Sequence, residues 1–201
     1  MPRILTQSDV ADFRERLCDV ATRMFDARGP EGFTMRELAA ELGVSAMTPY
    51  RYFKDKEDIL AAVRARAFNR FAAALESALE NDVDTAQMPG TAFRAYADFA
   101  FGEPAAYKLM FDLTQPDESL YPDLVKANAR ARAIMTDKIR LLVDKGVFVG
   151  DPDLIGHVLW ASLHGAIVLK LAGKLSREVD FDRISDEAFR VLSAAYRPKS
   201  A

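Results

Sequence analysis

One segment, Thr34–Lys56 with the sequence TMRELAAELGVSAMTPYRYFKDK, constrains the fold of this chain more than any other. Thr34 and Glu37 stand three residues apart, which is the spacing of a capping box at a helix start. An apolar stripe at helical spacing follows, formed by Met35, Leu38, Ala39 and Leu42. Gly43 comes directly after this stripe, where a left-handed residue can end a helix without steric cost. The segment therefore predicts a short helix that ends in a tight turn.

A second helix is predicted to begin at Ser45, whose hydroxyl suits an N-cap. Val44 lies in the turn before it, and we expect its side chain to be buried between the two helices. Pro49 conflicts with this helix, because it lacks an N–H donor and its ring crowds the carbonyl of Ser45. That position is still in the frayed first turn. We therefore expect the helix to persist, with its first turn loosened or its start one residue later.

The predicted second helix carries hydroxyls, aromatic rings and basic side chains in place of a full apolar stripe. Such a surface suits a helix that enters a DNA groove. Arg51, Lys54 and Lys56 lie at its end, with Asp55 as the only acidic residue among them. A solvated helix end would look similar, since residues 1–56 contain 9 basic and 9 acidic residues. A DNA-binding domain with this balance must gather its positive charge on one face.

The remaining sequence predicts an all-α fold, because apolar residues recur at helical spacing throughout. We expect further helices over about 8–28, 55–80, 90–101, 104–113, 124–146, 152–173 and 181–196. Polar segments separate some of them, at Asn81–Gly90 and Thr114–Ser119. Gly146–Gly150 is the one run that could form a short strand.

Composition excludes several classes of protein. A single cysteine excludes a disulfide framework and favours a reducing, cytoplasmic location. The N-terminus has no apolar core of a signal peptide. The longest apolar stretch, Val158–Leu169, has 12 residues, whereas a bilayer requires about 20, so no membrane association is expected. Two histidines and one cysteine give no cluster of metal ligands, and no motif indicates a cofactor.

The first predicted helix and the segment TMRELAAELGVSAMTPYRYFKDKEDIL resemble the N-terminal DNA-binding domain of TetR-family transcriptional repressors. The family pattern ends its recognition helix in an aromatic-x-aromatic-Phe run followed by Lys-Glu. Here these residues are Tyr50-Arg51-Tyr52-Phe53 and Lys56-Glu57. The resemblance covers roughly residues 8–60. Pro49 departs from it, because the family usually has an aliphatic residue before the first aromatic.

A weaker resemblance covers the second half of the chain. Trp160, His164 and Gly165 are similar to the Trp-His-Gly signature of one class of TetR-type C-terminal domains, and Glu103–Phe111 fits the same class. Such domains are all-helical, dimerise through their last two long helices and enclose a ligand pocket. The resemblance therefore implies a three-helix helix-turn-helix DNA-binding domain at residues 1–54 and a helical regulatory and dimerisation domain at residues 55–201.

The residues expected to bind DNA fall into two groups. Thr34, Tyr52 and Lys56 are expected to contact backbone phosphates, Thr34 because it starts a helix. The candidates to touch base edges are Ser45, Met47, Thr48 and Tyr50, while Arg51 could serve in either group. Phe53 is expected in the core, and Tyr50 could be partly buried too.

An effector pocket is predicted among the C-terminal helices, with aromatic and sulfur-containing walls and few polar anchors. Its candidate residues are Phe99, Tyr107, Met110, Phe111, Met135, Trp160 and His164. Such walls suit a mostly apolar small molecule held by one or two hydrogen bonds. Each of these residues could equally be a core residue, and His164 is more simply explained by a buried hydrogen bond than by a metal.

These patterns predict a DNA-binding transcriptional regulator, a repressor by the family's usual mode, that binds a two-fold-symmetric operator as a homodimer and is released by an apolar effector. One alternative is a helical small-molecule carrier that does not bind DNA. The other is a helical enzyme, which the sequence disfavours because no nucleophile stands beside a base. Cys18 is expected in the core, and the acidic residues that could serve catalysis are scattered, at Asp98, Glu103, Asp112 and Asp117.

Overall fold

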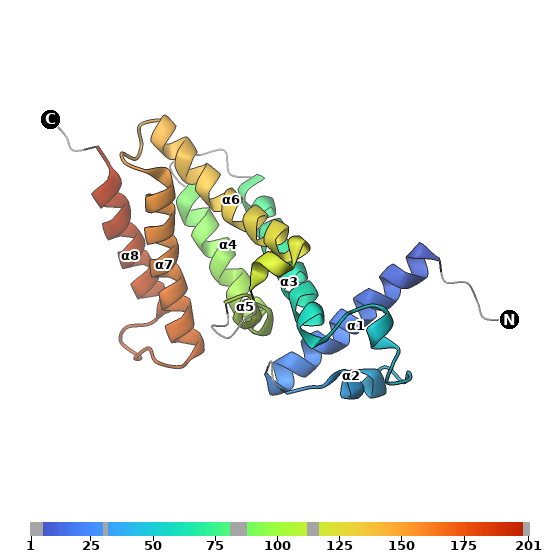
Figure 1. Cartoon of the computed structure of the whole chain (residues 1–201). Coiled ribbons are helices and arrows are strands. Elements are labelled where there is room, and N and C mark those ends of the chain that lie inside the picture. Colours follow the sequence, from blue (N-terminus) through green and yellow to red (C-terminus); the bar gives the residue numbers. More distant parts are fainter. Residues whose placement is uncertain (1–5, 30–31, 81–87, 112–116, 199–201) are drawn as a thin grey trace. The chain divides into compact units, whose positions relative to one another are not determined.

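The structure, a computed structural model, describes residues 6–29, 32–80, 88–111 and 117–198, and these residues are helical with no strand (Figure 1). The α-helices are α1 (Gln7–Arg28), α2 (Met35–Glu41), α3 (Lys56–Glu80), α4 (Met88–Gly102), α5 (Pro104–Phe111), α6 (Pro122–Asp144), α7 (Pro152–Leu171) and α8 (Phe181–Tyr196). Two single-turn 3-10 helices are η1 (Pro49–Arg51) and η2 (Glu118–Leu120). The expected all-α fold is confirmed, and Gly146–Gly150 forms no strand.

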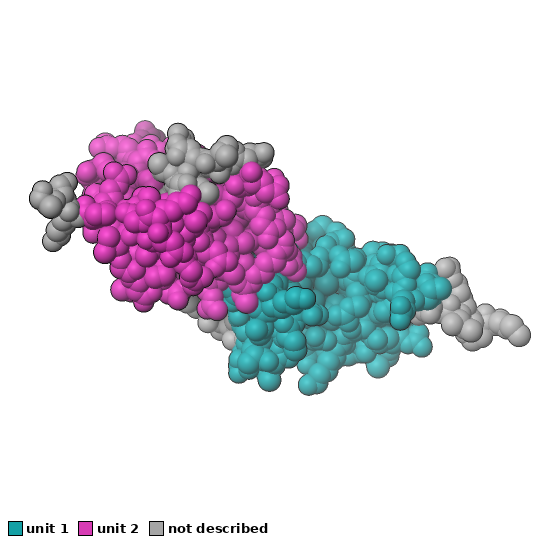
Figure 2. Space-filling view, turned by 90° about the horizontal axis from the view of Figure 1, so that it is seen from above, with its two compact units in different colours: residues 1–68, 105–128 teal, residues 69–104, 129–201 magenta. Residues whose placement is uncertain are grey.

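The chain divides into two compact units, coloured separately in Figure 2. Unit 1 contains Met1–Phe68 and Ala105–Asn128, and unit 2 contains Asn69–Pro104 and Ala129–Ala201. The domain boundary expected between residues 54 and 55 stays a prediction. Of the expected breaks at residues 81–90 and 114–119, residues 81–87 and 114–116 lie outside the described residues, whereas α4 already begins at Met88 and η2 begins at Glu118.

Unit 1 is built around one apolar cluster. Its most deeply buried members come from the first three α-helices and from the segments before α2 and α3, and they are Leu17, Cys18, Ala21, Phe25, Phe33, Leu38, Phe53 and Ile59. Leu109 of α5 joins the same cluster. Burying a side chain of this size contributes about 1.5–3 kcal/mol. The cluster therefore packs α1, α2 and the start of α3 together, and these helices support the segment between α2 and α3.

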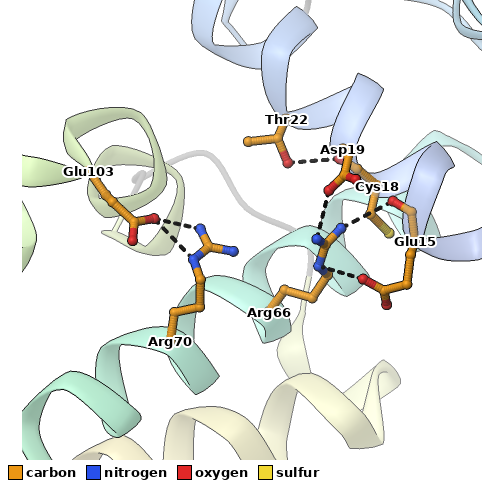
Figure 3. Close-up of polar contacts among 7 residues, drawn as sticks. All are labelled: Glu15, Cys18, Asp19, Thr22, Arg66, Arg70 and Glu103. Atoms are coloured by element: carbon orange, nitrogen blue, oxygen red, sulfur yellow. Dashed lines mark hydrogen bonds and ion pairs between the residues drawn. The ribbon is translucent and has the colours of Figure 1, made fainter. Parts of the chain in front are cut away.

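Arg66 ties α3 to α1 within unit 1 (Figure 3). Its Nη2 donates to Asp19 Oδ1 at 2.7 Å, and its Nε lies 3.2 Å from Glu15 Oε2. Burial lowers the pKa of Arg66, but the hydrogen bond to Asp19 and the charge of Glu15 raise it further, so the net shift is upward. Cys18 lies beside this group, and burial raises the pKa of its thiol. Cys18 is thus a protonated core residue, as expected.

Unit 2 is organised by α7, which contacts both α4 and α8. Asp151 caps α7 by accepting from the N–H of Asp153 at 2.9 Å, and Pro152 occupies the first turn, where its missing N–H costs no helical hydrogen bond. On α7, Trp160 donates from Nε1 to the hydroxyl of Tyr96 at 2.8 Å. A separate ion pair in this unit joins Arg70 Nη2 to Glu103 Oε2 at 2.7 Å (Figure 3).

The length of α7 differs from the 12-residue apolar stretch seen in the sequence. Its 20 residues have a mean hydropathy of 1.5 over an 18-residue window, so by length and composition alone α7 could cross a membrane. The core helix of a soluble protein meets the same criteria. Ile155, Leu159, Leu163 and Ile167 form a buried stripe along α7, and we therefore interpret it as a core helix.

Candidate nucleic-acid interface

Thr34 starts α2 through a capping box, as the sequence predicts. The backbone N–H of Thr34 donates to Glu37 Oε2 at 2.8 Å, and the N–H of Glu37 donates to Thr34 Oγ1 at 3.2 Å. The hydrogen bond from the Thr34 hydroxyl, followed by that from its N–H, lowers the pKa of the Glu37 carboxyl. The donors of Thr34 are therefore occupied by Glu37, which itself lies 3.4 Å from Arg28 Nη1.

The end of α2 also follows the sequence prediction. Gly43 adopts a left-handed conformation with φ +66°. Its N–H donates to the carbonyl of Ala40, and the N–H of Val44 donates to the carbonyl of Ala39, both at 3.0 Å. These two bonds form a Schellman motif, which satisfies the last carbonyls of the helix. Val44 is half-buried beside this turn.

The predicted α-helix from Ser45 onward is wrong, because the segment forms only the 3-10 turn η1. Pro49 has no N–H, so it cannot make the bond to the Ser45 carbonyl that an α-helix requires. That carbonyl accepts instead from Thr48 N at 2.9 Å, three residues along the chain. Ser45 is not a helix cap either, since its Oγ lies 2.9 Å from Thr48 Oγ1. Pro49 itself is buried.

The side chains of this segment divide between solvent and core. Met47 is 69% exposed and Tyr50 is 47% exposed, so neither side chain belongs to the core. Ser45 and Arg51 are exposed as well, and Thr48 is half-buried. Phe53 is only 2% exposed and packs in the core of unit 1, as predicted. The residues expected to touch bases thus lie together on a short segment anchored by its buried members.

Arg14 of α1 holds the C-terminal end of η1, a role that no sequence pattern indicates. Its guanidinium carbon lies 4.1 Å from the centre of the Phe53 ring, and its Nη1 donates to the carbonyl of Tyr52. The Tyr52 ring packs against Phe13, with 4.7 Å between ring centres. These contacts join residues 38 positions apart, which no local pattern reveals. These contacts hold Tyr52, which is predicted to bind a phosphate, against α1.

Lys56 is the first residue of α3, and its Nζ lies 5.2 Å from the centre of the Phe33 ring. Asp55 caps this helix, with its Oδ1 accepting from Asp58 N at 2.9 Å. Lys54, which precedes α3, is exposed to solvent. The contact with the Phe33 ring restricts where the Lys56 ammonium lies. Lys56 thereby places a positive charge at the C-terminal edge of the segment that contains η1.

The predicted effector-pocket residues fall in both compact units. In unit 1, Tyr107 and Met110 are buried, and the rings of Tyr107 and Phe111 lie 5.0 Å apart. In unit 2, Phe99 packs against Phe71 with 5.2 Å between ring centres. All four predicted residues named here take part in apolar packing.

The other predicted pocket residues lie in unit 2. The rings of Trp160 and His164 lie 5.8 Å apart, and burial lowers the pKa of His164, which keeps its imidazole neutral at pH 7. Met135 lines a cavity of about 20 Å³ with Ile139 and Leu159, enough for about one water. The effector pocket therefore stays a prediction. Within the described ranges, no group of three or more His, Cys, Asp or Glu residues is placed to hold a metal ion.

Comparison with known families gives two matches. Residues 17–63 match the family described as bacterial regulatory proteins, tetR family, and residues 90–195 match the tetracyclin repressor-like C-terminal domain. An HTH-type transcriptional regulator from Staphylococcus aureus (strain bovine RF122 / ET3-1) is 38% identical over 65 residues, or 32% of this chain. The matched segment spans 35% of that relative's length. The Trp-His-Gly subclass stays a prediction.

Solved structures share the fold over almost the whole chain. A protein of unknown function from Rhodococcus sp. RHA1 has a TM-score of 0.82 at 24% identity, covering 98% of this chain and 100% of that one. A regulator from Mesorhizobium loti, described as a putative TetR-family protein, has a TM-score of 0.70 at 21% identity over 96% and 100% of the two chains. A transcriptional regulator described as putative, from Saccharomonospora viridis in complex with choline, has a TM-score of 0.74 at 20% identity over 94% and 100%.

Proposed function

The chain belongs to the TetR family of bacterial regulatory proteins, and from this membership we propose that it is a transcriptional regulator that binds operator DNA. One observation carries the proposal: Met47, Tyr50 and Arg51 project from a turn whose Pro49 and Phe53 are buried. Exposed side chains on a fixed backbone can meet base edges in a major groove without a large ordering cost.

Each side chain in this segment has a defined role in the proposal. Met47 would contact a thymine methyl, and Tyr50 and Arg51 would donate hydrogen bonds to base edges or to phosphates. The hydroxyls of Ser45 and Thr48 complete the base-contacting set. Because η1 is a single turn, each copy of the chain would read only a few base pairs.

The phosphate contacts would flank this turn. Lys56 and the hydroxyl of Tyr52 supply donors at its C-terminal side, and both side chains are half-buried against aromatic rings. Thr34 can donate to a phosphate only when Glu37 releases its hydrogen bonds. The phosphate would then replace the Glu37 carboxylate at the N-terminus of α2.

We propose that two copies associate through α7 and α8. Leu154 and Val168 on α7 and Val191 on α8 are 59%, 44% and 47% exposed. Ile184 and Val191 line an open groove of about 820 Å³ along α8, to which α7 contributes Ser162. An exposed apolar surface of this kind marks an association site, and a two-fold dimer covers the same patch on both copies. Two copies then match a two-fold-symmetric operator.

An effector that binds in the helical C-terminal region would release the DNA, which makes the chain a repressor in the family's usual mode. A ligand shifts this equilibrium only if it binds the DNA-bound and free conformations with different affinities. Choline, bound by the Saccharomonospora viridis regulator, belongs in a first screen beside apolar compounds. The proposal places the protein in the cytoplasm, where operator DNA is accessible.

The test compares operator binding by the wild type, Tyr52→Phe and Lys56→Gln, with Lys126→Gln on the exposed face of α6 as the control. Each lost phosphate contact should lower the affinity for all sequences, and Lys56→Gln should also reduce the salt dependence by about one unit of slope, whereas Tyr52→Phe, which removes no charge, should leave that slope unchanged. Dimerisation should stay unchanged in all variants. Failure of the wild type to bind any DNA would favour a small-molecule carrier.

A further inference from the structure

Unit 2 has a groove that none of the residues predicted to form the effector pocket lines. It has a volume of about 490 Å³ and is lined by α4, by the N-terminal half of α8 and by Leu163 of α7. A volume of 300–1,000 Å³ is typical of sites for small molecules. Ile184 and Val191 of the proposed dimer patch do not line this groove, and Asp186 is the one lining residue that the two grooves share.

Aromatic rings form two walls of this groove. Phe93 and Phe189 lie with ring centres 5.2 Å apart, and Phe101 and Phe181 lie 4.8 Å apart, each pair edge to face. Within each pair one ring comes from α4 and the other from α8. Leu163, at 2% exposure, supplies a buried apolar floor. The walls can therefore enclose the apolar part of a ligand.

Carboxylates surround the same aromatic walls. Asp98 on α4 and Asp182 and Asp186 on α8 line the groove and are exposed, and Arg94 is the one cationic side chain among the lining residues. In the part of the chain that the structure describes, no hydrogen bond or ion pair occupies these three carboxylates. Among the described residues that line the groove, three carboxylates face one cationic side chain, so the groove carries an excess of negative charge.

We propose that this groove binds an organic cation with an apolar body, such as a quaternary ammonium compound. Aromatic faces attract a cation through their quadrupole, and carboxylates at the rim add a Coulombic attraction. An anionic ligand would be repelled by the three carboxylates. A neutral ligand would gain only apolar contacts with the Phe101 and Phe181 walls.

The ligand would contact α4 and α8 together. A ligand that binds the folded chain and not the unfolded chain raises the thermal stability of the protein, and the increase grows with the logarithm of ligand concentration. The site does not depend on DNA binding, and it would exist in a carrier as well as in a regulator. A binding assay without DNA therefore tests this proposal separately from the proposed function.

The experiment is titration calorimetry of the full chain with benzyltrimethylammonium chloride, with benzyl alcohol as the uncharged comparison and sodium chloride as the salt control. We expect the cation to bind and benzyl alcohol to bind at least about fivefold more weakly. The double variant Asp98→Asn/Asp186→Asn should weaken cation binding by roughly fivefold, because each exposed charge pair contributes little by itself. Phe101→Leu, which keeps an apolar wall without the ring, should also weaken it.

Asp144→Asn is the matched control, since Asp144 is exposed on α6 and does not line the groove. Its affinity for benzyltrimethylammonium should equal that of the wild type. Three results would each overturn the proposal: no binding of the cation, equal binding of benzyl alcohol, or unchanged affinity in both Asp98→Asn/Asp186→Asn and Phe101→Leu.

Discussion

Two neighbouring segments of unit 1, α2 and η1, obtain their conformations in different ways. In α2 both ends are closed locally, by the Thr34–Glu37 capping box and by the Schellman motif at Gly43. In η1 the backbone bonds span mostly three residues, and contacts from elsewhere hold the segment, chiefly Arg14 of α1 and the buried Phe53 ring.

The difference bears on how the chain would read DNA. The α2 helix buries Met35 and Leu38, and it serves as a rigid support. The η1 segment keeps Met47 and Tyr50 in solvent, and its shape depends on the core beneath it. Changes in that core should therefore alter the DNA-contacting segment more than changes in the caps of α2. The following substitutions test this dependence, from the largest expected effect to the smallest.

Phe53→Ala should have the largest effect, because it removes a ring that is 2% exposed. We expect a loss of about 3–5 kcal/mol in unfolding free energy. Tyr50→Ala is the control, since Tyr50 is a largely exposed aromatic in the same segment and its loss should change stability by less than about 0.5 kcal/mol. Urea unfolding measures both. Equal losses would mean that η1 is not anchored through Phe53.

Arg14→Met should destabilise the fold by about 1–2 kcal/mol, because it removes a cation–π contact and a charged donor to the Tyr52 carbonyl. Arg16→Met is the matched control on the same helix, since the guanidinium of Arg16 lies farther from a ring, at 5.5 Å from Phe13. Thermal unfolding compares the two variants. An equal loss of stability in both variants would mean that the contacts of Arg14 do not hold η1.

Thr34→Ala should cost about 1 kcal/mol, the typical value of an N-cap. Because the Thr34 hydrogen bonds lower the pKa of Glu37, that carboxylate contributes to stability above its ordinary pKa of 4.5 and loses the contribution as the pH falls through the lowered value. The stability difference between Thr34→Ala and the wild type should therefore shrink between pH 7 and pH 3.5. An NMR titration should also show a higher Glu37 pKa in the variant, and an unchanged pKa would contradict the capping box.

Pro49→Ala should change stability least, by less than about 1 kcal/mol, since the restored hydrogen bond opposes the greater freedom of the unfolded chain. The new N–H can donate to the Ser45 carbonyl, so η1 should become an α-helical turn. Backbone chemical shifts of residues 46–53 would report this change. Persistence of the 3-10 turn would show that the contacts of Arg14 and Phe53, and not the missing donor, determine its form.

The sequence predicts those parts of the fold that depend on neighbouring residues. Helix ends are marked by Thr34 with Glu37, by Gly43, and by Asp151 with Pro152, because a cap involves residues that are close in the chain. Apolar spacing likewise predicts α7 as a helix, which has a buried stripe, and the family matches cover residues 17–63 and 90–195. These local features were sufficient for the all-α fold.

Features set by distant contacts could not be predicted in the same way. The sequence contained the signal for η1, because Pro49 lacks a donor, but the size of its effect depends on the core contacts of Phe53. The contact between Arg14 and Tyr52 has no local pattern. The predicted pocket residues are all aromatic or sulfur-containing, yet Tyr107 and Trp160 belong to different compact units, and spacing along the chain does not determine this.

The central claim is that the exposed side chains around η1 bind DNA. Selection of bound sequences from a random DNA pool tests it most directly, with the wild type, the triple variant Met47→Ala/Tyr50→Ala/Arg51→Ala, and the control Leu120→Ala/Val125→Ala/Lys126→Ala, whose residues are exposed elsewhere in unit 1. We predict that the wild type and the control enrich the same two-fold-symmetric site and that the η1 variant enriches none. Enrichment of that site by the η1 variant, or of no site by the wild type, would contradict the claim.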